Sequence, residues 1–579
     1  MASISIDIND IEELKTNKIA LENNGADKKV VLLLDILVSM KAHNFEECCH
    51  LINSWLSRED TSEDHSGIIL TAISQITQVE DLRFLLVNTR TLLLRNLLEK
   101  KSLMNVPKFF HIIGFNKKSS EEKISILADE LVSHALTRAF SLKLIDVGLY
   151  LESLYYQEFV TRFETDKAFK FGMKQISHAI ESSGNELFRR LNPLGVDEFE
   201  HYDNAVPIVG IFFHNASMLA HIDNVFSCLK NLTEKSNLEF VPIIFCLGGR
   251  HSAFSKAFSS IGIEIVYLDE DRDGKPILLT SKRLLRLREI CLARQVDKLI
   301  WGCLSTYMLF TFSLKVAPEQ IWWSQKWTGL SSSTIQKSIY SITPKLKQQI
   351  NGDQWLGGWF QKESWLNDVD SKKLQESRKP FEGKLILGTL ARVQKMNDVR
   401  FLAVVATILK SNDNVVFLWT GREEDKFVDD FFVENGVKQK TKFVGWVDTS
   451  LYAQILDILL DSFPSGNGIT AIQAMEAKVP VVTRKSCGEI RTWDQFIGPS
   501  TEKGSVHQRQ VLEAFSIENG NQGLYHCAAS EEEYIAIANL LIRDPSLRKK
   551  SGEAGKKFVN LMMKNPSESS KIFQKHILS

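Results

Sequence analysis

Two short stretches in the last third of the chain hold residue types that could bind a diphosphate. In the first, Arg392 and Lys395 follow an apolar run that ends at Gly388. In the second, from Asp461 to Thr470, a polar turn with two glycines opens into a helical pattern. Cations and the unpaired amides of a helix start both stabilise the charge of a departing diphosphate. The alternative for the two cations is a solvated loop with ordinary surface side chains.

The sequence around both stretches alternates between short apolar runs and helical patterns, which predicts a parallel α/β sheet. Strands are expected at residues 384–388, 415–419, 442–444 and 480–482, with a helix at 398–410. An earlier block has expected strands at 207–213, 241–247, 263–268 and 298–301, with helices at 216–231 and 284–294. The polar residues 368–382 indicate an interdomain linker. Because ligands of such sheets bind at the carboxyl ends of the strands, we expect an active-site cleft between the two blocks.

Helical spacing of apolar residues dominates the first third of the chain. We expect helices at residues 30–40, 45–56, 67–77, 79–98, 121–142 and 147–163. No strict repeat period is present, which argues against a regular solenoid.

Composition restricts the class of protein. The 579 residues carry a net charge of -1, with 44% hydrophobic and 24% charged residues, as in a globular protein of about three or four domains. The near-neutral charge gives no reason to expect nucleic acid or an anionic membrane as a partner. We expect no secretory signal and no membrane span. The eight cysteines lack metal-binding spacing, so reduced thiols in a cytoplasmic protein are expected.

His214 stands at the end of the first expected strand of the earlier block, in Ile211-Phe-Phe-His. A histidine beside a helix start could donate to a phosphate or accept a proton near neutral pH. A packed or capping histidine is the alternative. His221 lies one to two helical turns further on, and we expect it to be structural.

The order of these motifs resembles glycosyltransferase family 41, which includes O-GlcNAc transferases and the bacterial cytoplasmic N-glucosyltransferases that modify adhesins. The resemblance spans about residues 205 to 560. It implies an α/β fold of the GT-B type, with two Rossmann-like domains facing a cleft after an all-α domain. The implied boundaries are 1–200 for the all-α domain, which would bind acceptor or partner, 201–378 for the acceptor-side domain and 379–579 for the nucleotide-sugar domain.

The resemblance also implies roles for individual residues. Lys395 matches the lysine that contacts the UDP diphosphate, and residues 442–447 match a segment whose backbone reads the uracil. The implied catalytic residues are His214 and Lys395. The implied nucleotide-sugar contacts are Thr389, Arg392, Lys395, Val444, Gly445, Trp446, Asn467, Gly468, Ile469, Thr470 and Gln473.

A further match, Ala317-Pro318 with Gln320, is followed by three tryptophans, Trp322, Trp323 and Trp327. These indoles could stack on a sugar or a peptide, or simply pack at the domain interface.

The chain departs from the family at Gln473, where an aspartate normally holds the ribose hydroxyls. A neutral amide lacks the charge assistance of a carboxylate, which places donor affinity in question. Retaining GT-B enzymes usually carry two glutamates around this helix, and Gln473 and Ser465 occupy those places. Glu476 lies one turn further on, where we expect it to face away.

These features predict an inverting, metal-independent transferase that moves a hexose from a UDP-sugar to an Asn or Ser/Thr side chain of a protein such as an adhesin. No cofactor is expected, because cations can assist departure without a metal; the acidic loop Asp269–Asp271 is interpreted as a solvated turn. One alternative is a GT-B transferase that extends a glycan or polysaccharide. The other is a non-catalytic GT-B subunit that supports a partner transferase.

Overall fold

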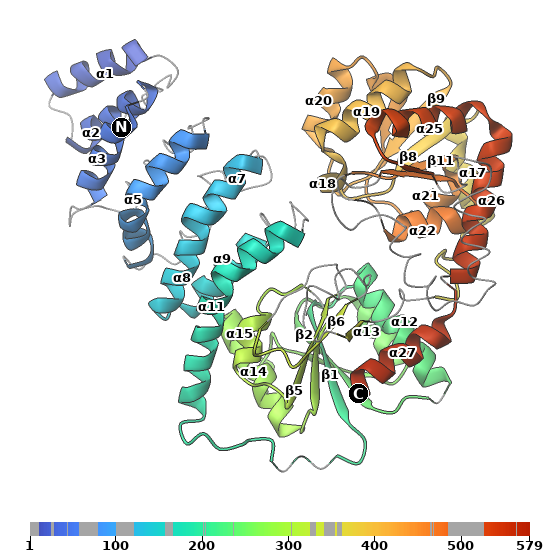
Figure 1. Ribbon diagram of the computed structural model, residues 1–579, viewed down its shortest axis with the longest axis horizontal. Coiled ribbons are helices and arrows are strands. Elements are labelled where there is room, and N and C mark those ends of the chain that lie inside the picture. The colour runs from blue at the N-terminus through green and yellow to red at the C-terminus, as the bar shows by residue number, and fades with distance from the viewer. Residues whose placement is uncertain are drawn as a thin grey trace.

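The computed structural model describes residues 11–24, 28–42, 44–56, 79–99, 121–156, 166–200, 202, 204–235, 237–302, 304–324, 332–340, 354–355, 362–463, 466, 468–484, 526–562 and 564–579. Within them, a helical region and two parallel sheets follow one another along the chain. In Figure 1 the helical region forms an arm beside the two sheet domains, which lie one above the other. The predicted fold class, two Rossmann-like domains after an all-α region, is confirmed.

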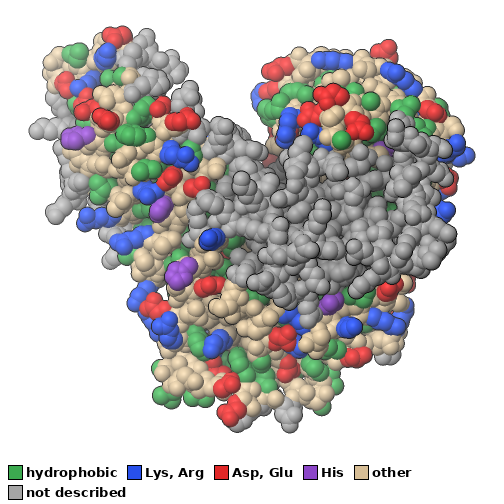
Figure 2. Space-filling view, in the orientation of Figure 1, with side chains coloured by type: hydrophobic (Ala, Val, Ile, Leu, Met, Phe, Trp, Pro, Cys, Tyr) green, Lys and Arg blue, Asp and Glu red, His purple; other side chains and the backbone are tan. Residues whose placement is uncertain are grey.

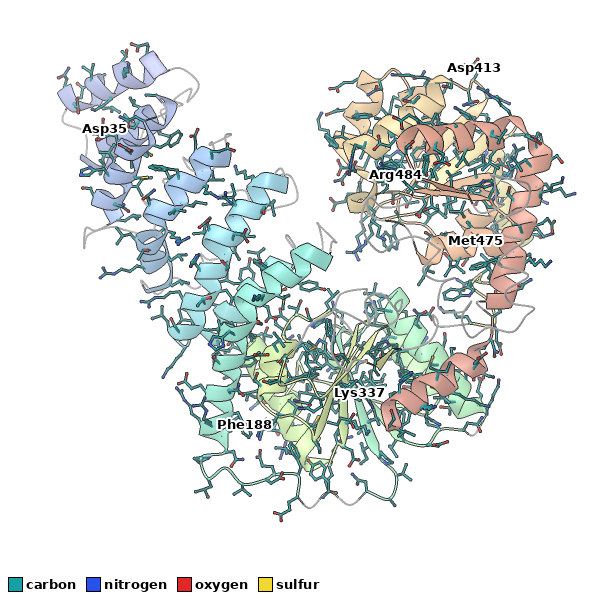
Figure 3. All side chains as sticks on the ribbon, in the orientation of Figure 1. Asp35, Phe188, Lys337, Asp413, Met475 and Arg484 are labelled. Carbon is teal, nitrogen blue, oxygen red and sulfur yellow. The ribbon has the colours of Figure 1, made fainter. Side chains whose placement is uncertain are left out.

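The helical region is built from helices that pack on their sequence neighbours, as the apolar spacing predicts. They are α1 (Ile11–Asn23), α2 (Lys28–Lys41), α3 (Phe45–Leu56), α5 (Val79–Glu99), α7 (Glu121–Leu127), the π-helical turn η1 (Ala128–Val132), α8 (Ser133–Ser141), α9 (Ile145–Tyr155) and α11 (Asp166–Leu191). The helix expected at 67–77 lies outside the described residues. Helix α11 leads into the first sheet domain, where the ring of Phe188 lies under the cations of Arg288 and Lys315 (Figure 3).

The first sheet has the strand order β3-β2-β1-β4-β5-β6-β7, and all its pairs are parallel. Its strands are β1 (Ile208–Asn215), β2 (Val241–Gly248), β3 (Glu264–Tyr267), β4 (Lys298–Trp301), β5 (Glu319–Ser324), β6 (Lys337–Tyr340) and β7 (Gln354–Trp355). Its helices are α12 (Ala220–Glu234), α13 (Ser252–Ser260), α14 (Thr280–Ala293) and α15 (Met308–Ser313). Near-continuous apolar strands, with Val209 to Phe213 buried, are typical of a sheet covered on both faces.

The second sheet has the order β10-β9-β8-β11-β12-β13 and is also parallel throughout. Its strands are β8 (Leu385–Thr389), β9 (Val415–Trp419), β10 (Thr441–Phe443), β11 (Ile458–Leu460), β12 (Val481–Arg484) and β13 (His526–Ala528). Its helices are α17 (Ser371–Arg378), α18 (Val393–Met396), α19 (Val399–Lys410), α20 (Lys426–Glu434), α21 (Thr449–Ile455), α22 (Ile469–Glu476), α25 (Glu531–Arg543) and α26 (Pro545–Met562), with 3-10 turns η3 (Lys379–Phe381) and η4 (Lys438–Lys440).

Aspartate side chains start several of these helices. Asp398, Asp425 and Asp448 each accept a hydrogen bond from a backbone amide two residues ahead. Such N-caps satisfy amides that have no partner inside the helix. The caps fix where α19, α20 and α21 begin, and hence how long the preceding loops can be.

Two segments differ from the sequence prediction. Residues 368–382, predicted as a linker, contain α17, which packs on α21 and belongs to the second sheet domain. Arg378, at the end of α17, pairs with Asp457 and donates to the Ile455 carbonyl. Helix α27 (Pro566–Leu578), at the end of the predicted nucleotide domain, instead packs on α12 of the first domain (Figure 1).

Candidate functional site

The carboxyl ends of three neighbouring strands, β8, β9 and β10, are tied together by short-range hydrogen bonds. The Thr420 hydroxyl donates to the Ala391 carbonyl at 2.8 Å, and the Gly421 amide donates to the Gly445 carbonyl at 3.2 Å. Gly445 has φ +75°, a conformation that favours glycine. The loops that hold the predicted residues therefore converge at one edge of the sheet, where parallel sheets bind ligands.

Lys395 reaches from the first of these loops to the turn before α22. The short helix α18 carries it, and its Nζ donates to the Gly466 carbonyl at 2.5 Å. Arg392 is the N-cap residue of α18, and its side chain is exposed. The two stretches predicted to share a diphosphate are thus in direct contact through Lys395.

Helix α22 begins directly after Gly468, whose φ is +55°. The Gly468 carbonyl accepts the amides of Ala471 and Ile472, so the helix starts at this glycine. Ile469 and Thr470 form the first turn and are partly exposed. A helix start of this kind presents amides and a positive dipole to an anion. Asn467 lies outside the described residues.

Asp461 supports the turn from below. It is buried, its Oδ2 accepts the Thr483 hydroxyl at 3.0 Å, and its carbonyl accepts the Tyr534 hydroxyl at 3.0 Å. A Cβ at position 466 would come within 2.9 Å of this carboxylate, so the glycine there permits the close approach. These contacts assign Asp461 to supporting the turn.

Trp446 is 62% exposed and follows β10 at the same sheet edge. The Arg422 guanidinium lies 5.5 Å from the centre of its ring, within range of a cation–π contact. Arg422 was not predicted as a site residue. Its position directly after Thr420-Gly421, at the end of a strand, could have indicated it.

Two other predicted contact residues have their side chains engaged inside the domain. The Thr389 hydroxyl is buried and donates to the Leu460 carbonyl at 2.7 Å, which joins β8 to β11. The Gln473 amide donates to the Trp365 carbonyl at 3.0 Å and to the Ser450 hydroxyl at 3.2 Å. Its Oε1 is buried and has no hydrogen-bond partner among the described residues. Val444 is partly exposed, and its amide donates to the Trp419 carbonyl.

His214 is the last residue but one of β1 in the other sheet domain, and aromatic rings surround it. Its Nε2 lies 2.9 Å from the Thr306 carbonyl, which can only accept, so Nε2 carries the proton and Nδ1 keeps a lone pair. The rings of Phe212, Trp301 and Tyr307 meet it edge-on. Burial lowers the pKa of His214 from 6.5 to about 4, so the ring is neutral at pH 7. Among the described residues no hydrogen bond joins it to the second sheet domain.

The helical region contacts the loop whose Thr306 carbonyl is hydrogen-bonded to His214. The Tyr307 amide donates to Glu152 of α9 at 2.9 Å, and Tyr307 has the left-handed φ of +65°. The other carboxylate oxygen of Glu152 is buried and has no hydrogen-bond partner within the described part of the chain. Burial raises the pKa of Glu152 to about 8. Sequence reasoning could not find this contact, because it joins residues 155 positions apart.

The tryptophans of β5 pack in the interior. Trp322 and Trp323 are 1% and 0% exposed, which supports packing over stacking on a ligand. Gln320 is buried between loops, where it accepts the Val316 amide and donates to the Phe312 and Thr334 carbonyls. Trp327 lies outside the described residues. His221, expected to be structural, is partly exposed in the first turn of α12.

Within the described ranges, no group of three or more His, Cys, Asp or Glu side chains is arranged to hold a metal ion. Asp271 of the acidic loop accepts the amides of Asp273 and Lys275, as in a tight turn. None of the described helices is long and apolar enough to cross a membrane.

Residues 384–504 match the family model described as "Glycosyl transferases group 1". Together with the two parallel-sheet domains, this match indicates a glycosyltransferase of the GT-B type. No curated protein matches the chain.

Solved structures with a similar course of the chain include two O-GlcNAc transferases and a protein in complex with UDP. An O-GlcNAc transferase mutant from Thermobaculum terrenum is 12% identical, with a TM-score of 0.47, over 96% of this chain and 99% of that one. HepE from Anabaena in complex with UDP is 10% identical, with a TM-score of 0.46, over 64% and 98%. The pneumococcal O-GlcNAc transferase GtfA with UDP and GlcNAc is 11% identical, with a TM-score of 0.43, over 65% and 99%.

Proposed function

We propose that the chain is an inverting, metal-independent glycosyltransferase that moves a hexose from a UDP-sugar to an Asn or Ser/Thr side chain of an acceptor protein. The observation that carries the proposal is the contact between Lys395 and the turn at Gly466. It places a cation beside the start of α22, so that a diphosphate on the helix amides would also meet the ammonium group. Both groups stabilise the negative charge that grows on the diphosphate as the sugar leaves.

The uridine would lie along the loops after β9 and β10. Val444, Gly445 and Trp446 supply backbone groups there, and the exposed Trp446 ring adds an aromatic face. Arg392 and the Arg422–Trp446 pair add positive charge at the same edge. These residues would hold UDP whichever sugar is attached.

Inversion is proposed because the helix lacks the two carboxylates that retaining enzymes carry. Gln473 and Ser465 stand in those places, and the Gln473 amide is turned to Trp365 and Ser450. In an inverting reaction the acceptor attacks the anomeric carbon from the face opposite the diphosphate. Lys395 can then assist departure without a metal.

The acceptor side is assigned to the first sheet domain. His214 is neutral there and keeps its Nδ1 lone pair, so it can accept a hydrogen bond from an acceptor group. The helical region, which contacts the loop at Tyr307, would bind the acceptor protein, in a cytoplasmic enzyme.

A binding and transfer experiment tests the proposal. Isothermal titration with UDP should give binding, and incubation with a UDP-sugar and Asn or Ser peptides should add one hexose mass to a peptide. Transfer only to free glycans would favour a glycan-extending enzyme instead. Absence of UDP binding would favour a non-catalytic subunit, which the neutral Gln473 keeps open.

A further inference from the structure

Within the part of the chain that the structure describes, the chain passes between its two sheet domains at two places. In the first, Lys362 pairs with Asp223 of α12 in the first domain, whereas Trp365 is buried in the core of the second domain. In the second, α26 packs on α22 of the second domain and α27 packs on α12 of the first. Lys564 and Asn565 lie between those two helices. We call residues 362–367 the first crossing and residues 564–565 the second crossing.

Glu476, the last residue of α22, contacts both crossings. Its Oε2 accepts the amide of Trp365 at 2.6 Å and the amide of Leu366 at 3.1 Å. Its other oxygen pairs with the Lys564 ammonium and accepts the Ser364 hydroxyl at 3.3 Å. Glu476 is only 5% exposed. The carboxylate therefore connects the two chain segments on which the orientation of the domains depends.

Neighbouring side chains strengthen the first crossing. Gln473, one turn earlier on α22, donates to the Trp365 carbonyl, and the Ser450 hydroxyl accepts the Asn367 amide. The Lys362 ammonium lies 5.1 Å from the centre of the Trp365 ring. The carboxylate, the amide and the indole together fix this segment on α22 at several points.

Helix α22 itself is held firmly in the second domain. Met475 of α22 is labelled in Figure 3. It packs against Gly555 of α26, where a Cβ on the glycine would come within 3.1 Å of the Met475 side chain. The helix starts at the predicted phosphate turn and ends at Glu476. A displacement of α22 is consequently transmitted to both crossings, because elements packed this closely move as rigid bodies.

We infer that Glu476 is a positioning residue. It fixes the angle between the two sheet domains by holding both crossings against the end of α22, the helix that starts at the predicted phosphate turn. Gln473 helps to hold the first crossing on the same helix, through its hydrogen bond to the Trp365 carbonyl. This accounts for an amide where the family has a ribose-binding carboxylate. The inference deepens the proposed function, because transfer requires the acceptor domain to close on the donor domain at a fixed angle.

Three variants test the inference. Glu476→Gln keeps one oxygen for the Trp365 and Leu366 amides but turns an NH₂ group to Lys564, so it loosens the second crossing and leaves these two amides bonded. Glu476→Ala loosens both. Glu553→Gln is the matched control, because Glu553 of α26 pairs with Lys478 just past the end of α22 at 2.9 Å, on the surface and within one domain.

Hydrogen exchange and small-angle X-ray scattering give the readouts. In Glu476→Ala we expect the amides of Trp365 and Leu366 to exchange about tenfold faster or more, and the maximum dimension to increase. In Glu476→Gln we expect altered scattering with these amides still protected, and in Glu553→Gln no change. Unchanged exchange and scattering in Glu476→Ala would overturn the inference.

A kinetic measurement separates the inference from the proposed function. Glu476→Gln should lower kcat for transfer while the Kd for UDP stays within about threefold of the unmodified protein, and Glu476→Asp should restore part of kcat. If the unmodified protein transfers no sugar, the proposed function fails. Hydrogen exchange and scattering still test whether Glu476 fixes the angle between the two sheet domains. If Glu476→Ala does not fold, Lys564→Met replaces it, and unchanged scattering in that variant overturns the inference.

Discussion

Lys395 is bonded to a backbone carbonyl that is also part of the turn around the expected phosphates. A carbonyl is a weaker partner for an ammonium group than a phosphate, because it carries no net charge. A diphosphate at the helix start can therefore compete with the Gly466 carbonyl for the ammonium group. The residue is poised for a charge that develops during the reaction.

Replacing Lys395 by alanine should lower transfer by about a hundredfold or more, since a single group that stabilises the transition state contributes on that scale. The melting temperature should change little, because the Lys395 side chain is partly exposed. Transfer rates and thermal melts measure both effects. Lys410→Ala is the control, because Lys410 ends α19 in the same domain, is exposed, and donates to the Asn435 side chain. Full activity in Lys395→Ala would refute the diphosphate role.

His214 should make the fold sensitive to acid. Its pKa is about 4 in the folded protein and 6.5 ordinarily, so the neutral form is favoured by folding. A base with a depressed pKa contributes stability that is complete above pH 6.5 and is lost as the pH falls towards 4. We expect His214→Gln to lose less melting temperature between pH 7 and 4.5 than the unmodified protein does. An identical loss would contradict the shifted pKa.

At the scale of elements, α9 and the β4–α15 loop are joined through Glu152. The Glu152 carboxyl accepts a hydrogen bond from the Tyr307 amide. Tyr307 has a left-handed backbone conformation, which costs a non-glycine residue roughly 1 kcal/mol or more. The same loop supplies the Thr306 carbonyl that fixes the tautomer of His214. The helical region and the acceptor-side histidine thus share one loop.

Glu152→Gln should stabilise the protein at alkaline pH. The pKa of Glu152 is about 8 in the fold against an ordinary 4.5, so folding favours the protonated acid. That contribution is complete below pH 4.5 and is lost as the pH rises through 8. Glutamine is neutral throughout and can still accept the Tyr307 amide. Melting temperatures at pH 6 and 9 should therefore differ less in Glu152→Gln than in the exposed control Glu47→Gln. Equal differences would argue against a buried acid.

Local sequence patterns predicted most helices and strands, because these elements depend on residues that are close in sequence. The helix Phe45–Leu56 and the strand Val415–Trp419 were predicted with the bounds that the structure has. The linker prediction at 368–382 failed because Ser371 to Arg378 is polar and none of its residues is buried, yet Asp370 caps it as a helix. Glu476, expected to face away from the site, lies at the far end of α22 from the predicted phosphate turn. Its contacts with Trp365 and Lys564 could not be predicted, because these residues are distant in sequence.

The candidate site was predictable to a similar extent. The two diphosphate stretches could be paired from the sequence, since each follows an apolar run, one ending at Gly388 and the other at Leu460. The inward turn of Gln473, the Trp446–Arg422 contact and the left-handed Tyr307 could not, because each depends on how separate loops meet in space. Such contacts leave no periodic signal.

At the scale of the whole molecule, charges are distributed without a dominant sign. On the face seen in Figure 2, acidic and basic side chains are interspersed over the coloured surface, in keeping with a net charge of -1. Long-range electrostatic steering is then weak. Recognition of an acceptor would depend on local contacts, which the helical region and the first domain have to supply.

After the second sheet domain the chain returns to the first, where its last helix, α27, packs on α12. Phe573 of α27 is fully buried, and its ring centre lies 4.8 Å from that of Trp323. Ile577 is buried in the same core, and Gln574 binds the backbone of Asn237 and Glu239. The first sheet domain is therefore completed by the C-terminal helix, although Gln574 and Asn237 are 337 positions apart in the sequence.

Phe573→Ala should consequently destabilise the first sheet domain by about 3–5 kcal/mol, the range for truncating a buried phenylalanine. Hydrogen exchange should show lost protection in β1, β2 and β5, while β8, β9 and β11 of the second domain keep theirs. Phe427→Ala is the matched control, because Phe427 is 48% exposed on α20 and its truncation should cost no more than about 0.5 kcal/mol. Loss of protection confined to the second domain would show that α27 belongs with the nucleotide domain. Equal stability of the two variants would show that α27 contributes nothing to the core it covers.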